Sequence, residues 1–186
     1  VAKGVRLENG EEIRSFVVVS NADPKRTFTT LFQPDEVAEE TVRRMKRWKT
    51  DAGSAKLLAA MTELPNLSRY LGDNYDPKTI GAITIAPSVE YYQQSWDDAK
   101  QGKPSSCPVM TVQLASSVDP GLVRGNGHVM SNWVVWEPPH PKDGTWDDLR
   151  EDVGEQIIDV LTEYTPNFRD SLLDWTLQTP ADMETR

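Results

Sequence analysis

The sequence predicts a mixed α+β protein, with helices packed on an antiparallel sheet and a hairpin near its start. Three observations indicate this class. An Asn9-Gly10 turn separates two short segments of alternating polarity, which is a strong hairpin signal because both turn residues tolerate positive φ. Two strand-like segments, 109–114 and 129–136, are joined by a turn-rich connection and are expected to be antiparallel neighbours. A helical apolar stripe then runs through residues 149–164.

The first 24 residues predict the hairpin and one further strand. Val5 and Leu7 alternate with charged residues before the turn, and Ile13 follows it. Residues 16–19 are a continuous apolar run, which is typical of a strand buried on both faces of a sheet. Loop-forming residues end the run, so residues 21–23 are expected to lie just beyond the end of this strand.

A helix is expected to begin at Pro34 and to present Val42 and Met45 inward. Pairs four residues apart, Glu39 with Arg43 and Glu40 with Arg44, are expected on its outer face. Its end is rich in cations, at Arg43, Arg44, Lys46, Arg47 and Lys49. This basic cluster is either a solvated face near the helix C-terminus or a contact with phosphate or a membrane surface.

The central part of the chain predicts strands and helices in turn. Residues 54–61 fit a strand or a helix, and residues 80–86 predict a strand. A helix follows Pro87-Ser88, with Val89, Tyr92, Trp96 and Ala99 on one side. Thr145 begins the long helix with a capping-box pattern, alternation from Leu173 to Leu177 predicts a last strand, and Thr179-Pro180 opens another helix.

Composition narrows the function classes. The chain has 186 residues, a net charge of −9 and a pI of about 4.7, so nucleic-acid binding, which needs basic surface, is excluded. The single cysteine, Cys107, excludes an internal disulfide and favours the cytoplasm or another reducing compartment over secretion. Both ends look cut, since the chain begins in strand-like sequence without Met and stops just after a helix start.

No motif for catalysis or metal binding emerges from the residues alone. His128 and His140 lack further ligands at zinc spacing, and the glycines of 121–127 lack the Lys-Ser/Thr ending of a P-loop. The chain is unusually rich in one aromatic residue type, since it has six tryptophans in 186 residues. Trp133 and Trp136 lie on opposite faces of one expected strand, and they either pack in the core or line an apolar ligand cavity.

Several stretches, in order along nearly the whole chain, resemble the phytoene dehydrogenase-like branch of FAD-dependent oxidoreductases, which includes carotenoid desaturases and isomerases. They are Gly-Val-Arg-Leu-Glu-Asn-Gly at 4–10, Val-Val-Val-Ser-Asn-Ala-Asp-Pro at 17–24, Pro-Ser-Val-Glu-Tyr at 87–91, Trp-Asp-Asp-Ala-Lys-Gln-Gly-Lys-Pro-Ser at 96–105, Gly-His-Val-Met-Ser at 127–131, Tyr-Thr-Pro-Asn-Phe-Arg-Asp-Ser at 164–171 and Thr-Pro-Ala-Asp-Met-Glu at 179–184.

The resemblance implies that this chain is an internal piece of a flavoprotein. Residues 1–24 would be a remnant of the FAD-binding domain, residues 25–178 the substrate domain, and residues 179–186 a truncated helix that returns to the cofactor domain. The glycine-rich phosphate loop of such proteins is missing, so the isolated chain is expected to be inactive and not to retain FAD. Asn21, Ala22 and Asp23 are the candidate FAD contacts, with a simple strand-ending turn as the alternative.

The implied substrate is hydrophobic, and a polyene fits the resemblance. Its candidate contacts are Met130, Trp133 and Trp136, on the strand whose two faces are both apolar. No catalytic acid or base is identified. The unpaired apolar face is expected to make the isolated chain self-associate, and a peripheral membrane contact of the parent protein stays open. The alternative function is a stand-alone module that binds an apolar ligand or a protein without catalysis.

Overall fold

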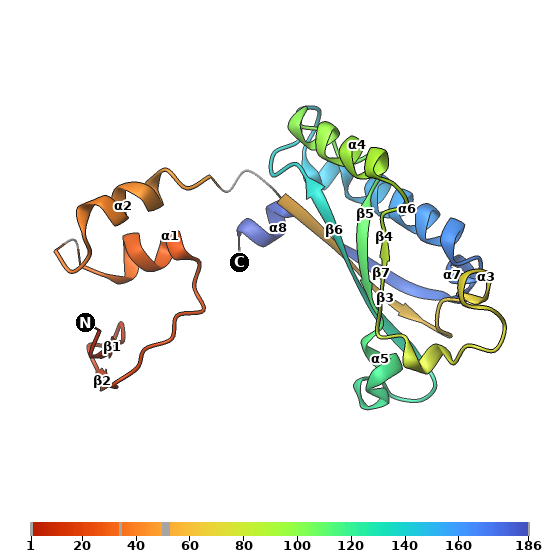
Figure 1. The fold of residues 1–186 in the computed structure, drawn as a ribbon, viewed down its shortest axis with the longest axis horizontal. Coiled ribbons are helices and arrows are strands. Elements are labelled where there is room, and N and C mark those ends of the chain that lie inside the picture. Colours follow the sequence, from red (N-terminus) through yellow and green to blue (C-terminus); the bar gives the residue numbers. More distant parts are fainter. Residues whose placement is uncertain (1, 34, 50–52, 186) are drawn as a thin grey trace. The chain divides into compact units, whose positions relative to one another are not determined.

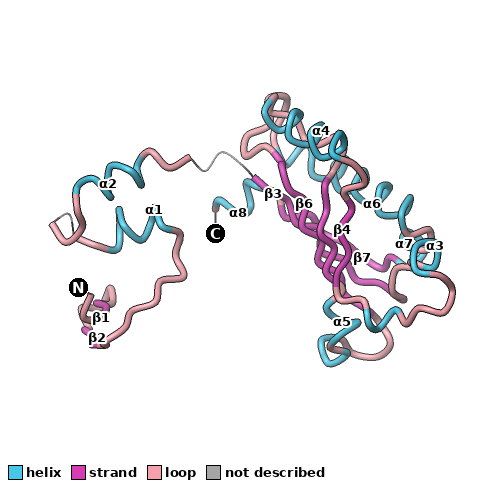
Figure 2. Tube along the Cα trace, viewed as in Figure 1, coloured by secondary structure: helices cyan, strands magenta, loops and turns pink. Residues whose placement is uncertain are grey.

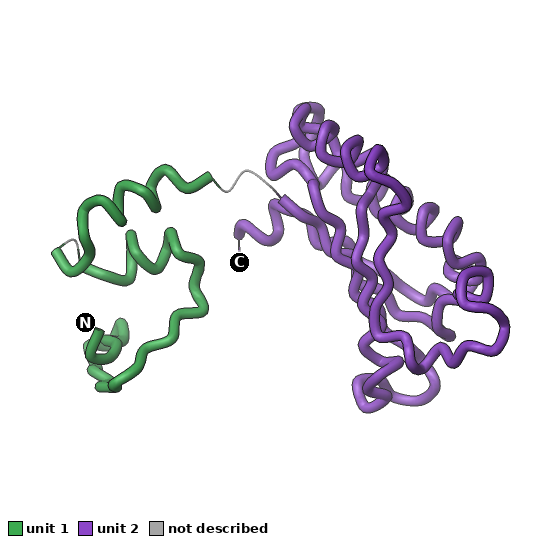
Figure 3. The backbone as a smooth tube through the Cα atoms, in the orientation of Figure 1, with its two compact units in different colours: residues 1–50 green, residues 51–186 purple. Residues whose placement is uncertain are grey.

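The computed structural model describes residues 2–33, 35–49 and 53–185. The chain forms two compact units, residues 1–50 and residues 51–186, which are coloured separately in Figure 3. None of the helices in the described ranges is both long and apolar enough to cross a bilayer. The structure confirms the mixed class, with antiparallel sheets of two and five strands among its helices. The predicted domain boundaries at residues 24 and 178 stay predictions.

The first unit begins with the predicted hairpin. Strands β1 and β2 pair antiparallel, with Val5 opposite Ile13, and the turn contains Gly10 at φ 88°. This confirms the Asn-Gly prediction, because few residues other than glycine and asparagine adopt a positive φ at low cost. The elements of the unit are β1 Gly4–Arg6, β2 Glu12–Arg14, α1 Pro24–Arg26, the π-helical turn η1 Thr27–Leu31 and α2 Glu39–Lys46.

The prediction of a buried strand at residues 16–19 is wrong for this structure. The segment is not assigned to any strand, and Phe16 and Val19 are 105% and 87% exposed. The physical reason is that a strand buried on both faces needs neighbouring strands and two covering layers, and the described part of unit 1 supplies neither. The four apolar residues are therefore exposed, without the neighbouring strands and covering layers that would bury them.

The predicted helix of the first unit exists but is shorter than expected. Its predicted start, Pro34, lies outside the described residues, and α2 is helical from Glu39. Inside the unit, Phe28 and Phe32 stack with ring centroids 5.8 Å apart, and α2 packs beside η1. Val42 and Met45 are half-buried, as the apolar stripe predicted, while the basic residues between and after them are exposed.

The second unit is built on a five-stranded antiparallel sheet in the order β4-β5-β6-β3-β7, drawn in magenta in Figure 2. The ambiguous segment 54–61 is a strand, and it lies between β6 and β7. The neighbours predicted from residues 109–114 and 129–136 do pair antiparallel, with Thr111 opposite Trp133. The strands are β3 Gly53–Met61, β4 Ala82–Ile85, β5 Val109–Gln113, β6 His128–Glu137 and β7 Leu172–Gln178.

Two long helices, α4 and α6, lie side by side near one face of this sheet (Figure 1). Hydrogen bonds through Ser105 join them, since Ser105 Oγ donates to Ser95 of α4 and Gln156 of α6 donates to the Ser105 carbonyl. Ser88 and Thr145 cap the two helices as predicted. The helices are α3 Ser68–Leu71, α4 Val89–Lys100, α5 Ala115–Val118, α6 Trp146–Tyr164, α7 Phe168–Ser171 and α8 Pro180–Glu184, with 3₁₀ turns η2 Pro77–Thr79 and η3 Pro120–Leu122.

The core lies between α6 and one face of the sheet. Alternate residues of β3 are buried, and the buried helix residues Val153, Ile157 and Leu161 pack against them in one apolar cluster. Gly154 also belongs to this contact, because a Cβ at that position would collide with the indole ring of Trp175. A small residue on α6 therefore lets the helix lie close to β7. The predicted packing of the sheet on the long helix is confirmed.

The apolar side of α4 is not the side it buries. Its apolar residues Val89, Tyr92 and Trp96 are 80%, 43% and 37% exposed, whereas Ser95 and Asp98 are buried. The buried side is polar because it receives hydrogen bonds from the loop that follows: Ser106 donates from its backbone N–H and its hydroxyl to Asp98. Polar burial of this kind has no periodic apolar signal in the sequence.

Candidate functional site

The candidate site is the face of the sheet opposite α6. Asn132 and Val134 of β6 are buried on the side of the sheet that α6 covers. Because side chains alternate along a strand, the residues next to them in β6 point away from the helix. An open depression of about 410 Å³ lies on the sheet. Its lining comes from β3, β6 and β7 together with the start of α5, namely Leu58, Ala59, Ala60, Ala115, Val129, Met130, Ser131, Asp174, Trp175 and Thr176.

Trp133 stands on this open face, 42% exposed, with Lys56 and Thr111 opposite it on the two neighbouring strands. Beside it on the same face, Ser131 Oγ is buried and has no hydrogen-bond partner among the described residues. A buried hydroxyl without a partner is uncommon, since desolvation is then uncompensated. The face therefore offers a partly aromatic surface beside a mainly apolar depression, with the Ser131 hydroxyl buried beneath it.

The structure separates the three residues predicted to contact substrate. Met130 is 3% exposed and belongs to the core cluster with α6, so its side chain is not on the open face. Trp136 lies at the end of β6 in an edge-to-face cluster with Tyr92 and Trp96, at centroid distances of 6.2 and 4.8 Å. Trp133 alone of the three is on the open face, and a substrate role for any of them stays a prediction.

Trp136 has an unusual backbone. It is the one non-glycine residue with a positive φ in the described ranges, at 64°, and its indole Nε1 is buried without a hydrogen-bond partner there. A bulky residue in the left-handed region costs of order 1 kcal/mol or more. The turn at Trp136 ends the regular alternation of β6 and carries its ring to α4, away from the open face.

The candidate FAD contacts lie in the first unit. Asn21, Ala22 and Asp23 are all exposed and precede α1. The Asp23 carboxylate accepts a hydrogen bond from the Arg26 backbone N–H at 2.9 Å, which makes it the N-cap of that helix. The side chains of Asn21 and Ala22 stay accessible, and a contact with a cofactor is still a prediction for all three.

A buried carboxylic acid, Glu137, was not singled out by the sequence. Its side chain is 1% exposed at the end of β6, and its carboxylate accepts a long hydrogen bond of 3.4 Å from the Ser105 backbone N–H. Burial raises the pKa of Glu137 to about 8; the Ser105 hydrogen bond opposes this shift and the nearby charge of Asp98 adds to it. Glu137 is thus held in its neutral form at neutral pH.

The other acid of this polar cluster, Asp98, behaves in the opposite way. Burial raises the pKa of Asp98, but hydrogen bonds from Ser106 and Gln94 outweigh burial and leave the pKa below its usual value. The two acids therefore differ in protonation because Asp98 has several donors and Glu137 has one. Neither lines the depression on the sheet, and both contact the loop residues Ser105 and Ser106 that follow α4.

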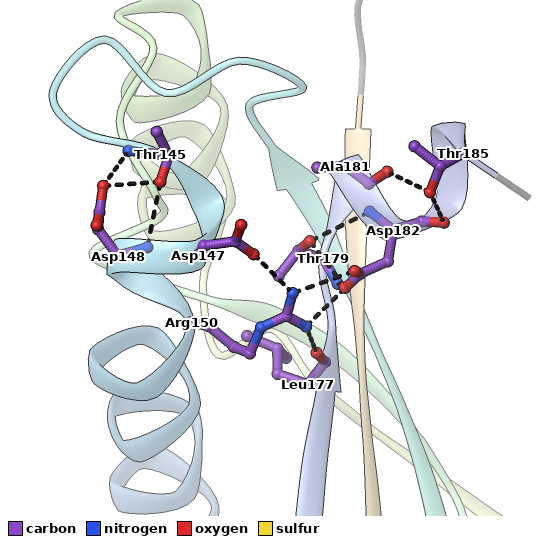
Figure 4. Close-up of polar contacts among 9 residues, drawn as sticks. All are labelled: Thr145, Asp147, Asp148, Arg150, Leu177, Thr179, Ala181, Asp182 and Thr185. Carbon is purple, nitrogen blue, oxygen red and sulfur yellow. Dashed lines mark hydrogen bonds and ion pairs between the residues drawn. The ribbon is translucent and has the colours of Figure 1, made fainter.

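A second polar cluster joins α6, β7 and α8 (Figure 4). The Arg150 guanidinium donates to the Leu177 carbonyl at 2.6 Å and forms an ion pair with both oxygens of Asp182, at 2.6 and 3.1 Å. Asp182 also accepts hydrogen bonds from the backbone and hydroxyl of Thr179, which completes the capping box of α8. These contacts hold α8 against the end of β7.

We expect Asp182→Asn to lower the free energy of unfolding by roughly 1 kcal/mol at pH 7, since both partners are only about two-thirds buried and solvent screens the pair. The hydrogen bond from Arg150 and those from Thr179 lower the pKa of Asp182, so its folded pKa lies below its unfolded value. Its contribution is therefore complete above the unfolded pKa, near 4, and is lost as pH falls further. Urea unfolding at pH 7 and pH 3 tests this, because the difference between wild type and variant should shrink at pH 3.

Comparison with known proteins gives a consistent result over nearly the whole chain, although no family model matches it. The chain is similar to proteins named as oxidoreductases. It is 31% identical over 188 residues to the pyridine nucleotide-disulfide oxidoreductase domain-containing protein 2 of Rattus norvegicus, a match that covers 98% of this chain and 32% of that protein. The protein of the same name from Mus musculus is also 31% identical, over 189 residues, with the same coverage.

A further relative carries a related name. The inactive all-trans-retinol 13,14-reductase of Danio rerio is 28% identical over 188 residues, covering 94% of this chain and 28% of that protein. The chain thus spans about a third of the length of these relatives. Among solved structures, the PF1083 protein of Pyrococcus furiosus matches 95% of this chain and 34% of its own, with a TM-score of 0.50 at 14% identity, which shows a likeness of fold alone.

Proposed function

We propose that this chain is the substrate-side portion of a longer FAD-dependent oxidoreductase similar to the phytoene dehydrogenase-like branch, acting on a hydrophobic substrate. The observation that carries the proposal is the open sheet face, where Trp133 is 42% exposed and a mainly apolar depression is lined by β3, β6, β7 and the start of α5. The names of the relatives support the oxidoreductase class, and their greater length is consistent with a cofactor domain elsewhere in the protein. A polyene substrate is the finer form of the proposal.

The chain's own residues fit a limited part of an FAD site. Residues 16–19 are exposed and lie outside any assigned strand, which fits an apolar segment whose partners lie in the cofactor domain, and Asn21 and Ala22 after it are free to contact a bound group. No glycine-rich phosphate loop occurs in the sequence. FAD would supply the redox chemistry when bound by the complete protein.

The part of this chain in such a reaction is to bind and orient the substrate. Trp133 would lie along the flat apolar body of the substrate, and the surrounding aliphatic residues of β3 and β6 would exclude water from it. No described residue is assigned to proton transfer.

The test compares this chain with the longer protein that contains it. We expect the longer protein to show flavin absorbance bands in stoichiometric amount and the 186-residue chain to show none. In the longer protein, Trp133→Ala should raise KM for a hydrophobic substrate about tenfold or more with intact flavin content, since a large aromatic contact is lost. Tyr70→Ala, a change at another exposed aromatic residue that lies on α3 and does not line the depression, serves as the matched control.

Two results contradict the proposal. A longer protein that binds no flavin would remove the oxidoreductase assignment, and stoichiometric flavin on the 186-residue chain would contradict the division of roles. The alternative, a stand-alone module that binds an apolar ligand or a protein, is less well supported because the oxidoreductase relatives match 94–98% of the chain. The self-association predicted for the isolated chain, from Trp133 or Trp136 beside exposed apolar surface, stays a prediction.

A further inference from the structure

The basic cluster at the end of α2 stands apart from the rest of an acidic protein. Five of the chain's 20 Lys and Arg residues fall between positions 43 and 49, while the net charge of the whole chain is −9. Three of them, Arg43, Arg44 and Lys46, are in the last turns of α2, and Arg47 and Lys49 follow directly. All five are exposed.

Intramolecular ion pairs do not neutralise this cluster. The sequence predicted that Glu39 would pair with Arg43 and Glu40 with Arg44, but neither pair is formed among the described residues, where the ion pairs all lie in the second unit. Pairs of this kind contribute only about 0.3–0.5 kcal/mol on a helix surface, so their absence is energetically unremarkable. It leaves the five positive charges available to an external anion.

An exposed aromatic residue lies within the cluster. Trp48 is 59% exposed, between Arg47 and Lys49, and its backbone N–H bonds to the Met45 carbonyl. The apolar side of α2, with Val42 and Met45, is half-buried and packs within the unit beside η1. The basic residues, Trp48 and the first-turn acids Glu39 and Glu40 are thus the surface that α2 and the residues directly after it leave to solvent.

We propose that residues 43–49 form a peripheral docking surface for membranes rich in anionic phospholipid. Charge complementarity carries the proposal, since clustered Lys and Arg are attracted to the negative surface potential of anionic lipid. Trp48 favours a bilayer over a dissolved phosphate, because tryptophan is enriched at the level of the lipid headgroups. The surface belongs to the first unit, and the inference does not depend on the flavin proposal.

The experiment measures cosedimentation of the 186-residue chain with lipid vesicles. Vesicles of phosphatidylcholine alone are compared with vesicles that also contain phosphatidylserine, at low and at high salt. We expect binding only to the anionic vesicles, with loss of binding at high salt. Changing the five cations to Gln should weaken binding about tenfold or more, and Trp48→Ser should weaken it several-fold while the salt dependence is kept.

The control removes the same charge elsewhere. Five exposed cations outside the cluster, none of them in an observed ion pair, are changed to Gln together: Lys3, Arg6, Arg14, Lys78 and Arg124. This variant should keep more than half of the wild-type affinity, and circular dichroism should show that both variants fold. Equal losses in the two variants, equal binding to neutral vesicles, or displacement by inorganic pyrophosphate at low concentration would each overturn the proposal.

Discussion

Glu137→Gln is expected to make the protein more stable than wild type at pH 8 and to give little advantage at pH 4.5. The carboxyl is 1% exposed, and its folded pKa of about 8 lies above the ordinary value of 4.5. Between these values the unfolded chain ionises Glu137 while the folded protein keeps it protonated. The free energy of unfolding of wild type therefore falls as pH rises through this window, by roughly 1 kcal/mol per pH unit, and levels off above it.

Urea unfolding from pH 4.5 to pH 8.5 measures this directly. A neutral amide of nearly the same shape does not ionise, so the difference between variant and wild type should grow with pH to a few kcal/mol. Glu151→Gln, at an exposed position on α6, is the matched control and should show no such trend. A difference for Glu137→Gln that stays constant across the range would contradict the buried, neutral carboxyl.

Phe168→Ala is expected to cost about 3–5 kcal/mol of unfolding free energy, the typical range for removing a buried aromatic ring. The ring is fully buried, at 0% exposure, in the cluster that joins α6, α7 and the sheet. Alanine would leave a cavity there, and the backbone of α7 is held by hydrogen bonds that limit its collapse, including Phe168 N–H to the Thr165 carbonyl.

The control for this substitution is Leu173→Ala, which removes a large side chain nearby at 64% exposure and should cost less than about 0.5 kcal/mol. Chemical unfolding followed by circular dichroism compares the two. Similar losses for Phe168→Ala and Leu173→Ala would show that the packing around α7 is looser than the structure indicates. Such a result would also weaken the assignment of α6 and the sheet to one continuous core.

Local signals in the sequence predicted local structure well. The Asn-Gly hairpin, the caps at Ser88, Thr145 and Thr179, and the pairing of β5 with β6 all follow from short stretches of residues, and the structure contains each of them. Turn and cap preferences depend on hydrogen bonds within a few residues, so they require no knowledge of the tertiary fold.

The errors concern contacts between distant segments. Residues 16–19 have the composition of a buried strand, but burial depends on neighbours that the described unit does not supply. Both faces of β6 are apolar in sequence, so the pattern does not reveal which face α6 covers, and Met130 and Trp133 in fact lie on opposite faces. The burial of Glu137 depends on Ser105, 32 residues away, and no pattern along the chain reveals it.

The strand order has a consequence for how the protein is made. β3 ends at Met61 and lies between β6 and β7, which begin only at His128 and Leu172. During synthesis β3 therefore leaves the ribosome long before either partner exists, as a nine-residue segment with Leu57 and Met61 among its apolar side chains. Pairing over such separations slows folding, and an unpaired apolar strand invites aggregation. A nascent chain stalled before residue 128 should depend on chaperones that hold extended apolar segments.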